Sequence, residues 1–260
     1  MSLQFGDVSV EVGDDHVALV EFHRPPNNFM DIGLLNSIAD AYAMLDADDA
    51  CRAIVLAAEG KHFCGGADFS APNDPELMDD DEAPSLYQVG TKLFRNAKPV
   101  VAAVQGAAIG GGMGLACTAD FRVGCPDVRM AAVFARLGFH HGFGLTASLP
   151  WLIGQQRALE LLYTGRRIDG VEAASMGLLD RLVDRSEVRD VARAMAADIA
   201  VSAPAAVQSI RQTMRGPLAE AVPVVAAREG AEQTRLRRTE DFAEGVLAMS
   251  ERRAPRFTGR

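Results

Sequence analysis

The stretch from Lys98 to Asp120, KPVVAAVQGAAIGGGMGLACTAD, constrains the possible folds of this chain more than any other. Its apolar run, Val100 to Val104, has the length of a buried strand. Three consecutive glycines, at 110–112, and small apolar residues then predict a tight turn that enters a helix. Backbone N–H groups at such a helix start have no intrahelical partner, and the helix dipole adds partial positive charge there. This geometry suits an oxygen that becomes negative during a reaction. A tight turn with close backbone packing is the alternative.

Composition indicates a soluble globular chain of 260 residues, with 48% hydrophobic and 23% charged residues. The formal net charge of -9 argues against nucleic-acid and anionic-membrane binding. Four cysteines without CxxC spacing favour a reduced, cytoplasmic chain over a disulfide framework or a metal site. The N-terminal stretch lacks the basic and apolar regions of a secretion signal. The apolar run at 99–119 contains many glycines and Gln105, so a buried segment is expected there rather than a membrane span.

The first half of the chain alternates strand and helix patterns. We expect a hairpin over 8–22, a helix over 32–45 and a buried strand over 53–57. A second glycine loop covers 59–68. The acidic segment 71–84 is predicted to be a mobile, solvated loop, and a helix is predicted over 86–94.

The second half begins with similar units and ends in helices alone. Strands are expected over 121–123 and 130–134, followed by a third glycine loop at 138–144. Helices are predicted at 146–152, 155–163 and 169–174, then a short strand at 182–183. From 186 onward the pattern is helical. The sequence thus predicts an α/β (α+β) fold of repeated strand–strand–helix units over 1–185, and a helical region over 186–260.

Several motifs in order resemble one known family. They are the Arg24-Pro25 loop; Arg52 to Leu56 with Phe63 to Asp68; Lys98 to Gly112 with Asp120; Leu162 to Arg166 with Ala173 to Leu178; and Thr239 to Phe257. Together these motifs are similar to the enoyl-CoA hydratase/isomerase (crotonase) superfamily. The resemblance implies a crotonase-like spiral of ββα units with a C-terminal helical trimerisation region. It also implies an acyl-CoA substrate, no cofactor apart from that coenzyme A, no metal, and a homo-oligomer that is a trimer or a dimer of trimers.

The resemblance also implies a site. The backbone N–H groups of Ala67 and Gly111 match the two donors that hold the thioester oxygen, an oxyanion hole whose donors stand about 2.7–3.1 Å from the anion. Asp68 is expected to fix the conformation of its own loop, 59–68. The residues expected to contact the substrate are Arg24, Pro26, Gly65, Gly66, Asp68, Phe69, Gly110, Gly114 and Phe134.

The chain departs from the family at two catalytic positions. Gly114 and Phe134 stand where hydratases of this family carry the two glutamates that position water and move the proton. Neither residue can act as a general acid or base. The small Gly114 is expected to leave room for a bulkier acyl group or a bound anion.

His141 is the candidate replacement base. It falls at a loop position that carries a catalytic aspartate in the related dihydroxynaphthoyl-CoA synthases, and histidine suits acid–base work near neutral pH. His140 is its neighbour. The alternative is that these histidines pack within the loop or cap the next helix. His62 is expected to pack in its loop or face solvent.

We therefore expect an acyl-CoA thioester-processing enzyme, a lyase of the hydratase/isomerase type. Double-bond isomerisation, decarboxylation and thioester hydrolysis remain open as reactions. A catalytically silent acyl-CoA binder and a purely structural oligomer are the alternatives from other classes.

Overall fold

A computed structural model gives the structure of residues 3–69 and 86–260. The acidic segment predicted at 71–84 lies outside these described residues. The strands are β1 (Leu3–Phe5), β2 (Val8–Val12), β3 (Val17–Phe22), β4 (Ala53–Ala58), β5 (Val100–Val104), β6 (Ala107–Ile109), β7 (Phe121–Gly124), β8 (Arg129–Ala131), β9 (Ile168–Asp169) and β10 (Arg181–Leu182).

The α-helices are α1 (Ile32–Ala47), α2 (Leu86–Gly90), α3 (Gly111–Thr118), α4 (Leu145–Ile153), α5 (Gln155–Thr164), α6 (Gly170–Met176), α7 (Val188–Ala200), α8 (Pro204–Leu236) and α9 (Glu240–Ser250). The described residues also form three short 3-10 helices, η1 (Thr91–Phe94), η2 (Val133–Leu137) and η3 (Arg185–Glu187).

Two sheets organise the described chain. The larger has the strand order β1-β2-β3-β4-β5-β7-β10, antiparallel from β1 to β3 and parallel from β3 to β10. The smaller has the order β6-β8-β9, and Cys64 adds an isolated parallel bridge to Ala108 beside β6. Two repeats place one strand in each sheet before a helix, β5 and β6 before α3 and β7 and β8 before α4, whereas β1 to β3 before α1 all lie in the larger sheet. The predicted strand–strand–helix units are therefore confirmed.

The apolar residues that predicted strands form the core. Every residue of β4 and β5 is buried, as expected for parallel strands covered on both faces. Asp31 caps α1 by accepting a hydrogen bond of 2.7 Å from the Leu34 N–H.

Two sequence expectations differ in detail. The predicted helix over 86–94 is divided into α2 and η1 at Gly90. The predicted strand over 130–134 ends early, because β8 stops at Ala131 and η2 begins at Val133. The Ala131 carbonyl there accepts the Gly110 N–H at 2.8 Å, which brings the end of β8 beside the glycine turn before α3.

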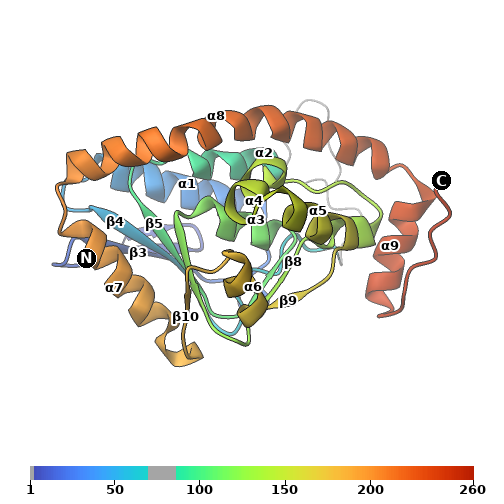
Figure 1. The fold of residues 1–260 in the computed structure, drawn as a ribbon, viewed down its shortest axis with the longest axis horizontal. Helices are drawn as coiled ribbons and strands as arrows, with labels where there is room; N and C mark the ends of the chain where they lie inside the picture. The colour runs from blue at the N-terminus through green and yellow to red at the C-terminus, as the bar shows by residue number, and fades with distance from the viewer. Residues whose placement is uncertain (1–2, 70–85) are drawn as a thin grey trace.

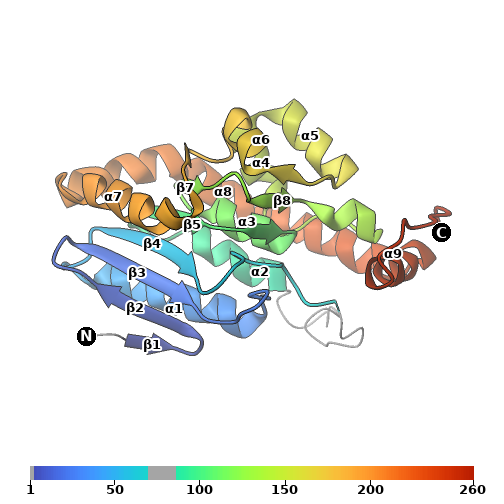
Figure 2. The same cartoon turned by 90° about the horizontal axis from the view of Figure 1, so that it is seen from below.

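The long helix α8 runs along one side of the molecule above α1, α2 and α4, and α9 lies at the far end of it (Figure 1). Figure 2 shows the strands β1 to β4 and helix α1 together on one side, with α4, α5 and α6 on the opposite side.

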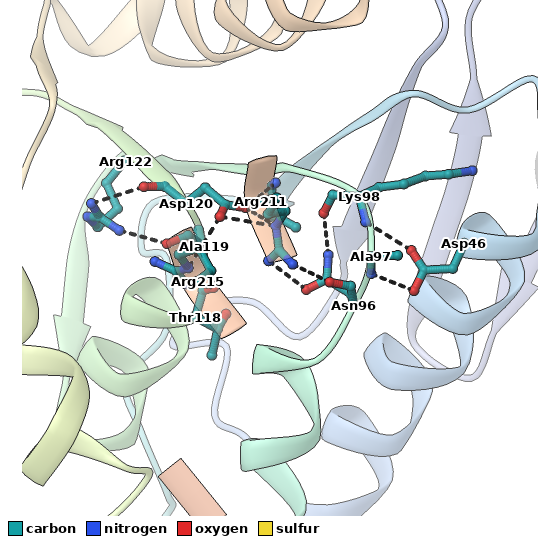
Figure 3. Close-up of polar contacts among 11 residues, drawn as sticks. Asp46, Asn96, Ala97, Lys98, Thr118, Ala119, Asp120, Arg122, Arg211 and Arg215 are labelled. Atoms are coloured by element: carbon teal, nitrogen blue, oxygen red, sulfur yellow. Dashed lines mark hydrogen bonds and ion pairs between the residues drawn. The ribbon is translucent and has the colours of Figure 1, made fainter. Parts of the chain in front are cut away.

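A buried polar cluster fastens α8 to the sheet (Figure 3). Asp120, after α3, accepts hydrogen bonds from the Val100 N–H at 2.8 Å and from the Arg211 Nε of α8 at 2.9 Å. Arg215 of α8 lies 3.3 Å from the same carboxylate and donates to the Thr118 carbonyl at 2.7 Å. Two cations and a carboxylate therefore hold the helix to the strand β5, with their charges paired away from water.

Candidate functional site: two glycine loops at an aromatic cavity

The two glycine loops named as the site lie against each other. The Ile109 N–H donates to the Cys64 carbonyl at 3.0 Å, and the Cys64 N–H donates to the Ala107 carbonyl at 2.9 Å. Gly66 has a φ of +88°, and a Cβ built there would lie 2.6 Å from the Ile109 carbonyl oxygen and 3.5 Å from the Gly111 nitrogen. Only glycine fits at this position, because the left-handed backbone and the close approach both exclude a side chain.

The backbone N–H groups of Ala67 and Gly111 differ in their hydrogen bonding from those of the neighbouring glycines. The N–H groups of Gly65, Gly66 and Gly110 donate to the Asn27 carbonyl, the Cys64 sulfur and the Ala131 carbonyl. Within residues 3–69 and 86–260, neither the Ala67 N–H nor the Gly111 N–H has an acceptor. Gly111 is also the first residue of α3, so its N–H belongs to the positive end of that helix.

Both residues line a cavity of about 450 Å³. Its walls are mainly apolar and aromatic. They include Phe29, Gly65, Gly66, Ala67, Asp68, Phe69, Tyr87, Ile109, Gly110, Gly111, Val133, Phe134, Leu137, Phe139, Met249, Ser250 and Arg252. A larger hollow of about 920 Å³ lies between η1 and α8, but neither glycine loop borders it.

Aromatic rings form a continuous wall. The Tyr87 ring meets Phe134 edge to face at 5.8 Å between centroids, and Phe134 meets Phe139 at 5.5 Å. Phe69 and Phe242 pack on Phe139 in the same way, at 5.8 and 5.2 Å. These edge-to-face contacts fix the ring positions and give the cavity a rigid apolar surface.

The space beside Gly114 is filled, so the expectation of extra room there is wrong. A Cβ on Gly114 would lie 2.6 Å from the Phe143 Cβ, and one on Gly90 would lie 2.4 Å from the Phe143 Cζ. The fully buried Phe143 ring is therefore held between two glycines. Gly114 does not border the cavity, whereas Phe134 contributes its ring to the wall.

His141 lies on the α8 side of its loop. Its Nε2 is 2.8 Å from the Thr146 Oγ1 and 3.8 Å from the Glu229 carboxylate of α8. Burial, with a smaller contribution from His140, lowers the pKa of His141 to about 3. Neither His140 nor His141 is among the described residues that border the cavity.

The Glu229 side chain of α8 holds the loop that carries His140 and His141. Its carboxylate, 2% exposed, accepts the Gly144 and Thr146 N–H groups, each at 2.8 Å, and so satisfies backbone donors at the start of α4. Burial raises the pKa of Glu229. The Gln233 amide donates to the His140 carbonyl at 2.9 Å. The placement matches the packing alternative for the two histidines, and a catalytic role for them stays a prediction.

Arg24 and Pro26 also lie away from the cavity wall. The Arg24 Nε donates to Asp7 at 2.6 Å and its guanidinium forms an ion pair with Asp31. The buried Asn28 that follows donates to the Glu59 and His62 carbonyls, each at 2.8 Å. This segment thereby positions the glycine loop at 59–68.

His62 packs in its loop as expected. Its Nδ1 accepts the Ala107 N–H at 3.3 Å, and burial lowers its pKa.

Sequence reasoning missed several cavity residues, notably Phe29, Tyr87, Phe139 and Met249. Phe29, Tyr87 and Met249 come from segments outside the glycine loops, whereas Phe139 lies in the third glycine loop, 138–144. An isolated aromatic residue in an apolar pattern is equally compatible with a core position and with a cavity wall. The sequence therefore held no signal that could identify these residues as cavity residues.

Comparison with known proteins shows the family. Residues 13–260 match the family model described as enoyl-CoA hydratase/isomerase. A probable enoyl-CoA hydratase of Bacillus subtilis (strain 168) is 30% identical over 257 residues, 95% of this chain and 96% of that protein. A carnitinyl-CoA dehydratase of Salmonella typhi is 31% identical over 93% of this chain and 94% of that protein. The chain belongs to the enoyl-CoA hydratase/isomerase family.

Solved structures agree on the fold. A carnitinyl-CoA hydratase from Mycobacterium avium superimposes with a TM-score of 0.86 at 28% identity, over 99% of this chain and 100% of that one. An enoyl-CoA hydratase/isomerase from Pseudoalteromonas atlantica T6c gives a TM-score of 0.86 at 28% identity, over 97% and 100%. The expected crotonase-like fold is confirmed. Across residues 3–69 and 86–260, no helix combines the length and apolarity that a membrane crossing requires.

Proposed function

We propose that this protein processes acyl-CoA thioesters by stabilising a thioester enolate. The carbonyl oxygen of the substrate accepts hydrogen bonds from the Ala67 and Gly111 N–H groups, and the acyl group occupies the aromatic cavity. Coenzyme A takes part only as a portion of the substrate.

One observation carries this proposal: two backbone donors without acceptors in the described chain lie on adjoining loops at the wall of an apolar cavity. Fixed donors in a site with little water stabilise a developing oxyanion strongly, and removal of one donor in other enzymes costs about 3–4 kcal/mol of barrier. The positive end of α3 adds to this stabilisation at Gly111.

The names of the relatives favour a hydratase or dehydratase reaction. The proton transfers would then need groups other than the usual glutamates, because Gly114 and Phe134 have no titratable side chain. Isomerisation, decarboxylation and thioester hydrolysis use the same oxyanion site and stay as alternatives.

A catalytically silent acyl-CoA binder is the second candidate. The Phe143 ring packed on Gly114 favours it, because that ring occupies the space beside the position of the first glutamate. A silent binder would bind CoA thioesters tightly and turn over none of them.

We also propose a homo-oligomer, with the helical C-terminal region as its assembly surface. Its support is a set of apolar side chains on α8 that stay exposed: Ile210 (63%), Met214 (63%) and Val224 (73%).

All four cysteines are free and buried, which supports the expectation of a reducing, cytoplasmic setting.

The experiment that tests the proposal has two parts. Binding of a saturated acyl-CoA is measured by calorimetry, and exchange of its α-protons with deuterated solvent is followed by NMR, beside turnover of a panel of enoyl-CoA esters. Binding with α-exchange supports an enolate-forming enzyme, and turnover of an enoyl-CoA would identify a hydratase. Binding without exchange or turnover favours the silent binder. An absence of binding would refute the proposal.

A further inference from the structure

Tyr87 is a polar residue at the cavity that belongs neither to the glycine loops nor to the loop that carries His140 and His141. It lies in α2, and its ring borders the cavity. Its Cε1 is 2.8 Å from the position that a Cβ would take on Gly111, so the ring lies directly over the first residue of α3. Its other edge faces Gly142, where a built Cβ would be 2.5 Å from the Tyr87 Cδ2. Both neighbours are glycines, and a side chain on either would displace the ring.

No hydrogen bond joins the hydroxyl of Tyr87 to another residue in the described parts of the chain, 3–69 and 86–260. The side chain is otherwise enclosed, with 4% of its surface exposed. Unlike the Tyr42 hydroxyl, which is fully buried without a partner, the Tyr87 hydroxyl stays accessible beside the cavity that its ring borders. An oxygen of a bound ligand would supply the missing acceptor.

Burial raises the pKa of the Tyr87 phenol, while the charge of Arg237 opposes this shift. The hydroxyl therefore keeps its proton at neutral pH and can act as a donor.

The other polar side chains of the cavity are less suited to this task. The Ser250 hydroxyl donates to the Leu247 carbonyl at 2.8 Å, and Asp68 is already held in an interaction of its own. Arg252 is exposed. A neutral donor beside Gly111 is thus available from Tyr87.

We propose that Tyr87 is a catalytic residue whose hydroxyl donates a third hydrogen bond to the thioester oxygen, beside the Ala67 and Gly111 N–H groups. This inference rests on the proposed acyl-CoA function. Tyrosine hydroxyls serve as oxyanion donors in other enzymes, where the gain arises because the donor is fixed before the charge develops. No proton leaves the phenol in this step, since the hydrogen bond alone stabilises the enolate oxygen.

Tyr87→Phe tests the proposal, because it keeps the ring and its packing and removes one oxygen. We expect kcat, or the rate of α-proton exchange, to fall about 10²–10³-fold, the range for loss of one oxyanion donor. The KM and the Kd for a saturated acyl-CoA should stay within about threefold, because the hydrogen bond strengthens mainly as charge develops.

Tyr42→Phe is the matched control. Tyr42 lies in α1, is 2% exposed, and has a buried hydroxyl without a partner, yet it is not among the described residues that border the cavity. It should leave the rate unchanged. A Tyr87→Phe rate within threefold of the Tyr42→Phe rate would overturn the proposal.

A second readout does not depend on turnover. In protein labelled with fluorotyrosine, the ¹⁹F resonance missing from Tyr87→Phe identifies residue 87. We expect this resonance to move when a saturated acyl-CoA binds, whereas that of Tyr42 stays in place. Binding that leaves the Tyr87 resonance unmoved overturns this proposal and leaves the acyl-CoA function standing. If calorimetry shows no binding at all, the proposed function fails and this inference fails with it.

Discussion

Gly66→Ala tests whether the close approach of the two glycine loops matters for function. The new Cβ would stand 2.6 Å from the Ile109 carbonyl oxygen and 3.5 Å from the Gly111 nitrogen, and neither atom belongs to a flexible side chain. The two loops must therefore separate. Backbone donors that move by about 1 Å lose the geometry that an oxyanion requires, and a displacement of this size costs about 10²-fold in rate.

The expected loss of stability follows from the same geometry. A side chain at a φ of +88° costs about 1–2 kcal/mol, and overpacking against backbone adds about 1–3 kcal/mol. Gly177→Ala is the control: Gly177 has a φ of +84°, but among the described residues a Cβ there would meet only the Leu152 carbonyl oxygen, at an ordinary 3.7 Å. Gly177→Ala should thus lose about 1–2 kcal/mol, and Gly66→Ala about 2–5 kcal/mol.

The assay compares α-proton exchange of a saturated acyl-CoA, or enoyl-CoA turnover if it is found, in both variants at a temperature where both stay folded. Urea unfolding supplies the stabilities. We expect a rate about 10²-fold lower in Gly66→Ala than in Gly177→Ala. Equal rates in two folded variants would refute the reasoning that the contact of these loops builds the site.

Three further predictions concern the surroundings of the site. Gly114→Ala should destabilise the protein by about 1–3 kcal/mol, because its Cβ meets Phe143, and should be close to neutral in a Phe143→Gly background; additive urea unfolding energies would contradict this. The pKa of His141 is about 3 in the folded protein and about 6.5 in the unfolded chain. Between these two pH values the unfolded chain binds more protons than the folded protein, so the free energy of unfolding falls as the pH drops from about 6.5 towards 3. His141→Gln should flatten that slope in urea titrations, and an unchanged slope would count against the buried neutral imidazole. Asp120→Asn should cost about 3–5 kcal/mol, since it leaves two nearly buried arginines without their carboxylate, whereas Asp15→Asn in an exposed ion pair should cost below about 1 kcal/mol. Similar losses in urea unfolding of both variants would be the contrary result.

The order of strands and helices was predictable from the sequence because it depends on local patterns. The run from Val100 to Val104 is apolar throughout, and it forms a strand buried on both faces. The glycines at 110–112 predicted the turn into α3 for the same reason. Boundaries were less predictable, as at Ala131, where the end of β8 depends on a hydrogen bond from the distant Gly110.

The surroundings of the site depend on contacts between distant segments. Nothing in the sequence near Gly114 shows that Phe143 fills the adjoining space, since the fit also requires a glycine at position 90. The position of His141 is likewise set by Glu229, a carboxylate on α8 that caps the start of α4. Local motifs therefore predicted the two glycine loops, at 59–68 and 110–112, while the cavity walls required the structure.

The most direct test of the account is the infrared stretching frequency of the thioester carbonyl in a bound acyl-CoA labelled with ¹³C at that carbon. Two fixed N–H donors at Ala67 and Gly111 should polarise the carbonyl more than water does, so we predict a lower frequency in the complex than in free solution. Gly177→Ala should keep this shift and Gly66→Ala should lose most of it. A carbonyl that binds at its solution frequency would contradict the claim that these two loops form an oxyanion hole.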